Sequence, residues 1–330
     1  MGSHESKRLS KRPCALRQSP GLLASALAVA MLVAATRSAA QTMRVPKPGP
    51  LVYAWLDGST VRSHVYVKLP DEPDARLIYD EPGIISQAKW SPDGEQIAFD
   101  DDGLLVMNAD GSDLRRLTDA EFWARPPFTW GPEDHQITYY KPKAQGDGDL
   151  WILDARNPEN ERNLTRQGGG FAGPAWSPDR SRIAYSWGPV GGGTLYVMDA
   201  DGGNIMVITQ GRYPSWSPDG NRLVFTRHGN GLATDVYVVD AREGAAPQRL
   251  TQAPYYKYSP VWVADGPWIA YGESGDLHLI SLDGREAHKM GVRKGIPAIT
   301  NFDWFDPFRA VSAEGRLPSR WGSLKARETP

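Results

Sequence analysis

The sequence predicts an all-β fold, a six-bladed β-propeller of four-stranded antiparallel blades. Three observations carry this prediction: a recurring tryptophan motif, its regular spacing and an incomplete first repeat. A W-S-P-D-G-like segment begins at tryptophans along most of the chain: Trp90, Trp130, Trp176, Trp216, Trp262 and, in a degenerate form, Trp304. The spacings are 40, 46, 40, 46 and 42 residues, the period at which four-stranded blades repeat around a propeller.

The clearest copy spans residues 174–209 and justifies the four strands of a blade. Trp176 and the runs 183–185, 195–198 and 206–208 are rich in β-branched, aromatic and other large apolar residues, and S-P-D, a glycine-rich loop and A-D-G-G separate them. This pattern predicts a four-stranded meander. A ring of such blades buries both faces of each blade and leaves only short strand edges.

The first repeat lacks its tryptophan strand. Residues 51–80 supply L-V-Y-A-W, H-V-Y-V-K-L and A-R-L-I-Y, which match the second, third and fourth strands of the frame. Trp304 supplies a first strand that is not followed by second, third and fourth strands of its own. We therefore expect segment 299–312 to pair with the N-terminal strands and close a ring over residues 51–312. Five or seven blades would leave one of these segments unpaired.

The repeat resembles that of the TolB-type β-propeller family, whose blades carry W-S-P-D-G-x-x-I-A-F followed by Y-V-M-D-x-D-G and a later L-T. The resemblance covers roughly residues 51–312. It implies a non-enzymatic binding module that presents a face and a central mouth to protein partners at the cell envelope. One fold hosts many functions, so the motif predicts the fold more specifically than the activity.

The N-terminus has the layout of a secretory signal peptide. Basic residues between 7 and 17 precede an apolar run at 21–35, and Ser38-Ala39-Ala40 suits signal peptidase. The run is shorter than the roughly 20 residues that span a bilayer, so we expect Sec export, cleavage after Ala40, no transmembrane segment after processing and a periplasmic or secreted protein. Residues 41–50 read as a flexible leader and residues 313–330 as a C-terminal tail.

Processing also decides the charge and the cysteine content. The single cysteine, Cys14, precedes the apolar run, so the processed chain has none and no lipid anchor is implied. Removing residues 1–40 leaves 31 basic and 38 acidic residues, a net charge near −7. This argues against nucleic acid or an anionic membrane surface as partner. We expect a monomer.

The loops divide into two sets that lie on opposite faces of a propeller. The S-P-D-G and A-D-G turns are short and alike, so Asp93, Asp179 and Asp219 are interpreted as turn residues. The other set varies in length and is rich in aromatic residues and arginine, as interface anchors are. On this variable-loop face we predict partner-binding residues: Trp123, Arg125, Phe171, Trp187, Arg212, Tyr213, His228, Tyr255, Tyr256 and Lys257.

Two alternatives stay open for these residues and for the function. Some of the aromatic side chains could pack between blades, as the six repeat tryptophans are expected to do. A propeller hydrolase or lyase acting on carbohydrate or peptide at the axial mouth is the second functional class. No G-x-S-x-G nucleophile context, metal-ligand spacing or cofactor motif supports it. Asp147 and Asp149, or Asp100–Asp102, could supply oxygen ligands to Ca²⁺ but lack an established loop motif.

Overall fold

The computed structural model describes residues 50–304 with several gaps. The gaps are 58–61, 70–71, 73, 120–126, 132, 144–147, 167–170, 189–191, 230–232, 253, 264–266 and 291–300. The predicted signal peptide (1–40), the leader apart from Pro50, and the tail (313–330) lie outside the described residues, so these assignments stay predictions.

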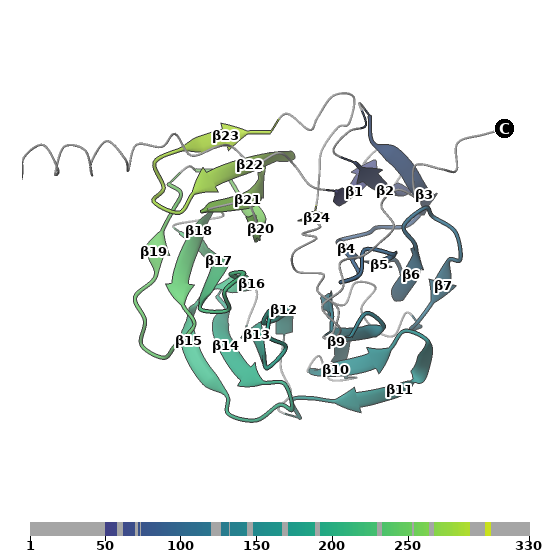
Figure 1. The fold of residues 1–330 in the computed structure, drawn as a ribbon, viewed down its shortest axis with the longest axis horizontal. Helices are drawn as coiled ribbons and strands as arrows, with labels where there is room; N and C mark the ends of the chain where they lie inside the picture. The colour runs from purple at the N-terminus through teal and green to yellow at the C-terminus, as the bar shows by residue number, and fades with distance from the viewer. Residues whose placement is uncertain are drawn as a thin grey trace, which may run out of the picture. The chain divides into compact units, whose positions relative to one another are not determined.

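In the described part of the chain, 24 strands form six four-stranded antiparallel sheets around an axis (Figure 1). This confirms the predicted six-bladed propeller. Blade 1 contains β4 (Ala88–Trp90), β5 (Gln96–Asp100), β6 (Leu104–Asn108) and β7 (Arg115–Arg116). Blade 2 contains β8 (Phe128–Trp130), β9 (Gln136–Pro142), β10 (Gly148–Asp154) and β11 (Asn157–Asn163). Blade 3 contains β12 (Phe171–Trp176), β13 (Arg182–Trp187), β14 (Thr194–Asp199) and β15 (Met206–Gln210).

The remaining blades follow the same order from the inner strand outward. Blade 4 contains β16 (Arg212–Trp216), β17 (Arg222–His228), β18 (Thr234–Asp240) and β19 (Gln248–Arg249). Blade 5 contains β20 (Lys257–Val263), β21 (Trp268–Glu273), β22 (Asp276–Ser281) and β23 (Ala287–Lys289). The closing blade contains β24 (Asn301–Trp304), β1 (Leu51–Asp57), β2 (Arg62–Lys68) and β3 (Arg76–Pro82).

The closing blade joins the two ends of the repeat array, as predicted. β24 pairs with β1 in antiparallel register, with Leu51 opposite Trp304. The Asp303 carboxylate accepts a hydrogen bond from the backbone N–H of Trp90 in blade 1 at 3.0 Å. On the other side, the Asn301 side-chain amide donates to the Ser259 hydroxyl of blade 5 at 2.8 Å. This short strand therefore links three blades.

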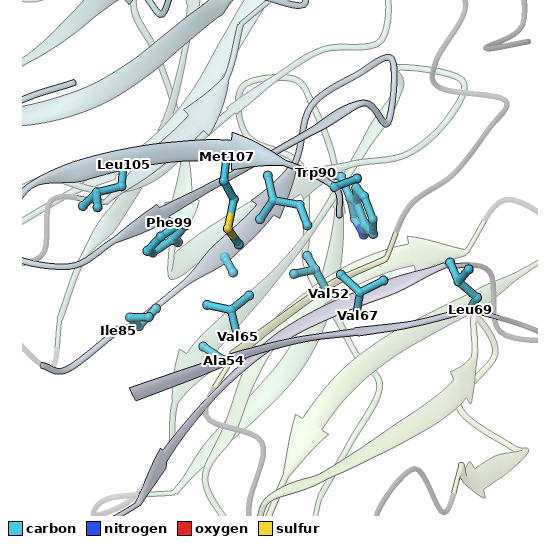
Figure 2. Close-up of a cluster of buried hydrophobic side chains, with 13 residues drawn as sticks. Val52, Ala54, Val65, Val67, Leu69, Ile85, Trp90, Phe99, Leu105 and Met107 are labelled. Atoms are coloured by element: carbon cyan, nitrogen blue, oxygen red, sulfur yellow. The ribbon is translucent and has the colours of Figure 1, made fainter. Parts of the chain in front are cut away.

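Apolar side chains of neighbouring blades fill the space between them. Figure 2 shows this core between the closing blade and blade 1, where Val52, Val65 and Val67 meet Phe99 and Met107. All five are at most 1% exposed. Full burial of such a side chain contributes about 1.5–3 kcal/mol to stability, so the ring can be stable without disulfides.

The described repeat tryptophans pack between blades, and the indoles of Trp130, Trp176, Trp216 and Trp262 donate hydrogen bonds to the preceding blade. The indole Nε1 of Trp216 donates to the Ala175 carbonyl at 3.0 Å, and that of Trp262 donates to the Ser215 carbonyl at 3.2 Å. The guanidinium of Arg182 lies 4.7 Å from the Trp216 ring centroid. Trp90, Trp130, Trp216 and Trp262 are buried and Trp176 is half-buried, while the Trp304 side chain lies outside the described residues.

The aspartates of the S-P-D turns bond within their own turns. The Ser217 hydroxyl donates to Asp219 at 2.5 Å and the Asn221 N–H donates to it at 3.1 Å. Ser91–Asp93 and Ser177–Asp179 repeat this arrangement. The hydrogen bond from the serine lowers the pKa of Asp219, and that of Asp179 is lowered for the same reason. These aspartates close the turns at one end of the ring.

Candidate functional site

The inner strands of all six blades line a channel of about 810 Å³ along the axis of the ring. At the turn end its walls include Pro92, Gly131 and Pro178, and at the variable-loop end they include Gln87 and Tyr256. The charged lining residues that the structure describes are Lys89, Arg180 and Asp303. A cavity of this size lies in the range of ligand-binding sites.

Three consecutive inner strands carry the same irregularity near the variable-loop end. In β12, β16 and β20 the pairing with the next strand shifts by an irregularity of the β-bulge type. At each shift a residue with positive φ precedes a proline: Gly173 (φ 57°), Tyr213 (φ 54°) and Ser259 (φ 49°). Because bulges redirect side chains, and because a left-handed non-glycine residue costs about 1–2 kcal/mol, Tyr213 is held in a strained and specific orientation.

Four tyrosines gather at this end of the channel. We call Tyr213, Tyr255, Tyr256 and Tyr258 the tyrosine cluster. Tyr213, Tyr255 and Tyr256 are 40%, 56% and 48% exposed, and Tyr258 is half-buried. The rings of Tyr256 and Tyr258 are stacked, with centroids 6.3 Å apart and an interplanar angle of 22°. Because exposed clusters of large aromatic side chains are typical of interaction sites, this mouth is the candidate site.

Glycines of neighbouring strands seat two of these rings. A Cβ atom on Gly272 would lie 2.0 Å from the Tyr258 ring, and one on Gly173 would lie 3.1 Å from the Tyr213 ring. The missing side chains therefore allow each ring to approach the backbone beside it closely. This seating limits the conformations that the Tyr213 and Tyr258 rings can adopt.

Arg212 lies beside the tyrosine cluster. Its guanidinium carbon is 5.7 Å from the Tyr213 ring centroid. Burial raises the pKa of Tyr256, Tyr213 raises it further and Arg212 opposes the shift, which places these three groups in one electrostatic environment. The Tyr256 hydroxyl therefore remains a protonated hydrogen-bond donor at neutral pH.

Lys257 does not face a partner, although the sequence suggested that it would. Its side chain is fully buried, with Nζ 3.6 Å from the Asp235 carboxylate and 3.5 Å from the Glu273 carboxylate. Nζ also donates to the carbonyls of Thr234 at 3.2 Å and Tyr255 at 3.0 Å. A buried ammonium needs such partners. Lys257 thus anchors the segment that carries Tyr255, and we leave it out of the proposed surface.

The other predicted residues are distributed as follows. Arg212, Tyr213, Tyr255 and Tyr256 come together at the mouth. Trp187 is 41% exposed at the end of β13, and His228 is half-buried at the end of β17; neither is among the channel residues. Trp123, Arg125 and the Phe171 side chain lie outside the described residues. Their roles stay predictions.

Sequence reasoning missed several residues that line the channel. Lys89, Thr129, Ser215 and Asp303 each precede a repeat tryptophan by one position and come from four different blades. The repeat register was visible in the sequence, so the position before each tryptophan could have been read as a ring facing the axis. This sequence signal is weak because the four residues differ in charge and in functional group.

Two of the acidic residues considered as calcium ligands, Asp149 and Asp100, are held by protein groups, and Asp147 lies outside the described residues. Asp149 is paired with Lys143 at 2.6 Å and accepts hydrogen bonds from Asn163 and Thr165. Asp100 accepts from the Ser86 and Gln87 N–H groups. No group of three or more His, Cys, Asp or Glu side chains suited to a metal ion occurs among the described residues. Nor does the described part contain a helix of the length and apolarity needed to cross a membrane.

No protein family model matches the chain. A stretch of 106 residues is 30% identical to YuxL, an uncharacterized peptidase of Bacillus subtilis; it covers 29% of this chain and only 16% of that protein. Among solved structures, TolB from Acinetobacter baumannii has a TM-score of 0.62 at 16% identity, over 78% of this chain and 67% of that one. A putative TolB from Agrobacterium tumefaciens has a TM-score of 0.59 at 16% identity, over 79% and 100%.

These likenesses define the class of the molecule. It is a six-bladed β-propeller. Its fold is that of the TolB proteins, which confirms the resemblance seen in the repeat motif at the level of fold. At this sequence identity the likeness shows the architecture and leaves the function to the site.

Proposed function

We propose that the protein is a non-enzymatic binding module that takes a protein partner on its variable-loop face, at the tyrosine cluster. The observation that carries this proposal is the gathering of three exposed tyrosines, of which Tyr213 is seated on Gly173, with Arg212 at the channel mouth. Tyrosine and arginine are enriched among the residues that dominate protein interfaces. Rigid aromatic side chains give large contact areas at low conformational entropy.

The compartment belongs to the same proposal. A signal peptide over residues 1–40 would deliver the chain to the periplasm or the exterior, where its partner would be an envelope or secreted protein. The TolB-like fold supports an envelope role. We further propose that the processed chain acts as a monomer, since the ring closes on itself through β24 and β1.

The alternative, a hydrolase or lyase at the axial mouth, has less support. Cleavage of a glycosidic or peptide bond needs an acid–base pair or an activated nucleophile within reach of the substrate. Among the described lining residues there is one carboxylate, Asp303, and no histidine. That carboxylate accepts a hydrogen bond from the Trp90 N–H. The similarity to a peptidase covers only 16% of that protein.

The test is a pull-down from envelope extract with the full chain and a variant carrying Tyr213→Ala, Tyr255→Ala and Tyr256→Ala. The wild type should retain a partner that the triple variant loses, because each anchor residue contributes about 2 kcal/mol or more to binding. Melting temperatures of the two proteins should be close, since about half of each of the three side chains is exposed and none belongs to the core between blades.

Two control variants separate this result from general effects. The variant Leu114→Ala and Val207→Ala removes side chains that are 47% and 49% exposed elsewhere on the ring, and should keep the partner. Asp219→Ala removes the carboxylate that accepts hydrogen bonds within its turn. It should lower the free energy of unfolding by about 1 kcal/mol and leave partner binding unchanged. A triple tyrosine variant that melts far below the wild type, or that still captures the partner, would contradict the proposed surface.

A further inference from the structure

Arg212 differs from other arginines at the variable-loop ends of the blades. Arg249 is paired with the Asp235 carboxylate at 2.5 Å. Arg227 donates to the Gln210 carbonyl at 2.8 Å and to the Thr209 hydroxyl at 2.6 Å. Arg116 donates to backbone carbonyls of the loop that follows β5. Each of these guanidinium groups has an acceptor within the protein.

Arg212 has no acidic partner in the part of the chain that the structure describes. None of the ion pairs there includes it, and its buried Nε has no hydrogen-bond acceptor there. A guanidinium carries five N–H donors in a planar fork. A buried donor without an acceptor costs about 1–3 kcal/mol, and no ion pair with a described residue offsets this cost at Arg212.

Three contacts restrict the position of Arg212 and its side chain. The Arg212 carbonyl accepts a hydrogen bond from the Thr226 hydroxyl at 3.2 Å. The aliphatic stem crosses Gly193, where a Cβ atom would lie 3.0 Å from Arg212 Cγ. The guanidinium lies over the Tyr213 ring, which the bulge before Pro214 holds in place. A guanidinium over an aromatic ring can still donate hydrogen bonds from its terminal N–H groups.

Arg212 is the charged group beside the tyrosine cluster, and it favours an anionic ligand there. The charged lining residues of the described channel are Lys89, Arg180 and Asp303, and Arg180 belongs to the turn at the opposite end, next to Asp179. The chain without residues 1–40 carries a net charge near −7, so a cation without an acidic partner stands out in an acidic protein. Arginine matches a carboxylate through two parallel hydrogen bonds.

We propose that Arg212 is the specificity-determining residue of the mouth and that it binds a carboxylate of an acidic peptide segment. An aromatic or proline residue next to that carboxylate would stack on Tyr213 and Tyr256. This inference rests on the proposed function, because it assigns the chemistry of the partner segment that the tyrosine cluster receives. In this arrangement stacking provides most of the contact area, and the carboxylate determines the position of the peptide along the mouth.

The experiment selects peptides from a random phage-displayed library on the full chain. Selected peptides should carry Asp or Glu within about three residues of an aromatic residue or proline. One selected peptide is then measured by calorimetry. Arg212→Gln should weaken the binding of this peptide by at least about tenfold. The affinity of Arg212→Lys, which keeps the charge but lacks the planar fork, should lie between those of the wild type and Arg212→Gln. Arg242→Gln, at an exposed arginine beside Asp240, should leave binding unchanged.

A double-mutant cycle identifies the contact. Replacing the acidic residue of the peptide by its amide should cost the same factor as Arg212→Gln, and the two changes together should cost little more than either alone. Thermal unfolding of each variant shows that the fold is intact.

Contrary results separate the inference from the proposed function. Selected peptides without acidic residues, or equal affinities of the wild type and Arg212→Gln, would overturn the carboxylate assignment and leave the binding module standing. If no peptide is selected while the chain still retains its partner from envelope extract, the assignment of a linear acidic segment falls alone. If no peptide is selected and no partner is retained from envelope extract, both the carboxylate assignment and the proposed function are overturned.

Discussion

At the scale of single residues, the most unexpected group is Lys257, a fully buried ammonium between two carboxylates. Asp235 also accepts hydrogen bonds from Thr251 at 2.9 Å and Arg249 at 2.5 Å. The cluster is therefore fully paired. Its loss would affect both stability and the tyrosine cluster, because Lys257 holds the Tyr255 carbonyl.

We predict that Lys257→Met lowers the free energy of unfolding by about 3 kcal/mol, since removal of the ammonium leaves Glu273 without its cation and Asp235 with Arg249 alone. Urea denaturation measures this difference. Arg242→Met is the matched control: that side chain is 72% exposed beside Asp240, and its removal should change stability by less than about 1 kcal/mol. Equal stabilities of the two variants would show that the buried cluster contributes nothing.

At the scale of elements, the segment that leads into β4 depends on one buried carboxyl group. Asp100, at the end of β5, accepts hydrogen bonds from the Ser86 N–H at 3.0 Å, the Gln87 N–H at 2.7 Å and the Ser86 hydroxyl. Ser86 and Gln87 line the channel. Burial raises the pKa of Asp100 to about 7, although these hydrogen bonds oppose the shift.

The sign of the pH effect follows from this raised pKa. Between about pH 4, where an unfolded aspartate titrates, and about pH 7, the folded protein retains a proton that the unfolded chain has lost. The contribution of Asp100 to stability is thus full below about pH 4 and is lost as the pH rises towards 7.

We predict that Asp100→Asn removes this contribution to the pH dependence of the free energy of unfolding. The stability of the variant relative to the wild type should therefore increase as the pH rises. Denaturant titrations from pH 4 to 8 test this, with the exposed Asp113→Asn as control, and parallel curves for the wild type and Asp100→Asn would contradict it.

At the scale of the whole molecule, the fold could be predicted because its signals are local and repeated. Trp90 to Trp304 gave the blade count, and the missing first strand before Leu51 gave the closure, since only a ring pairs both ends. The site was harder to predict. The bulge at Ser259 changes the register within β20, so neither the burial of Lys257 nor the stacking of Tyr258 follows from strand alternation. Asp303 enters the channel only after the ring closes.

Ring closure carries the last prediction. β24 contributes the pairing with β1, the buried Phe302, the Asp303 bond to Trp90 and the Asn301 bond to Ser259. Deleting residues 299–330 removes all of these and leaves β1 as a bare strand edge. Because a domain is stable by only about 5–15 kcal/mol, we expect the melting temperature to fall by more than about 10 °C and the truncated chain to associate through the exposed edge.

The control is a deletion of residues 313–330, which keeps β24. This shorter truncation should have the melting temperature of the full chain. Thermal unfolding followed by circular dichroism, with size-exclusion chromatography, distinguishes the two truncations, and equal melting of both would show that the ring holds without its closing strand.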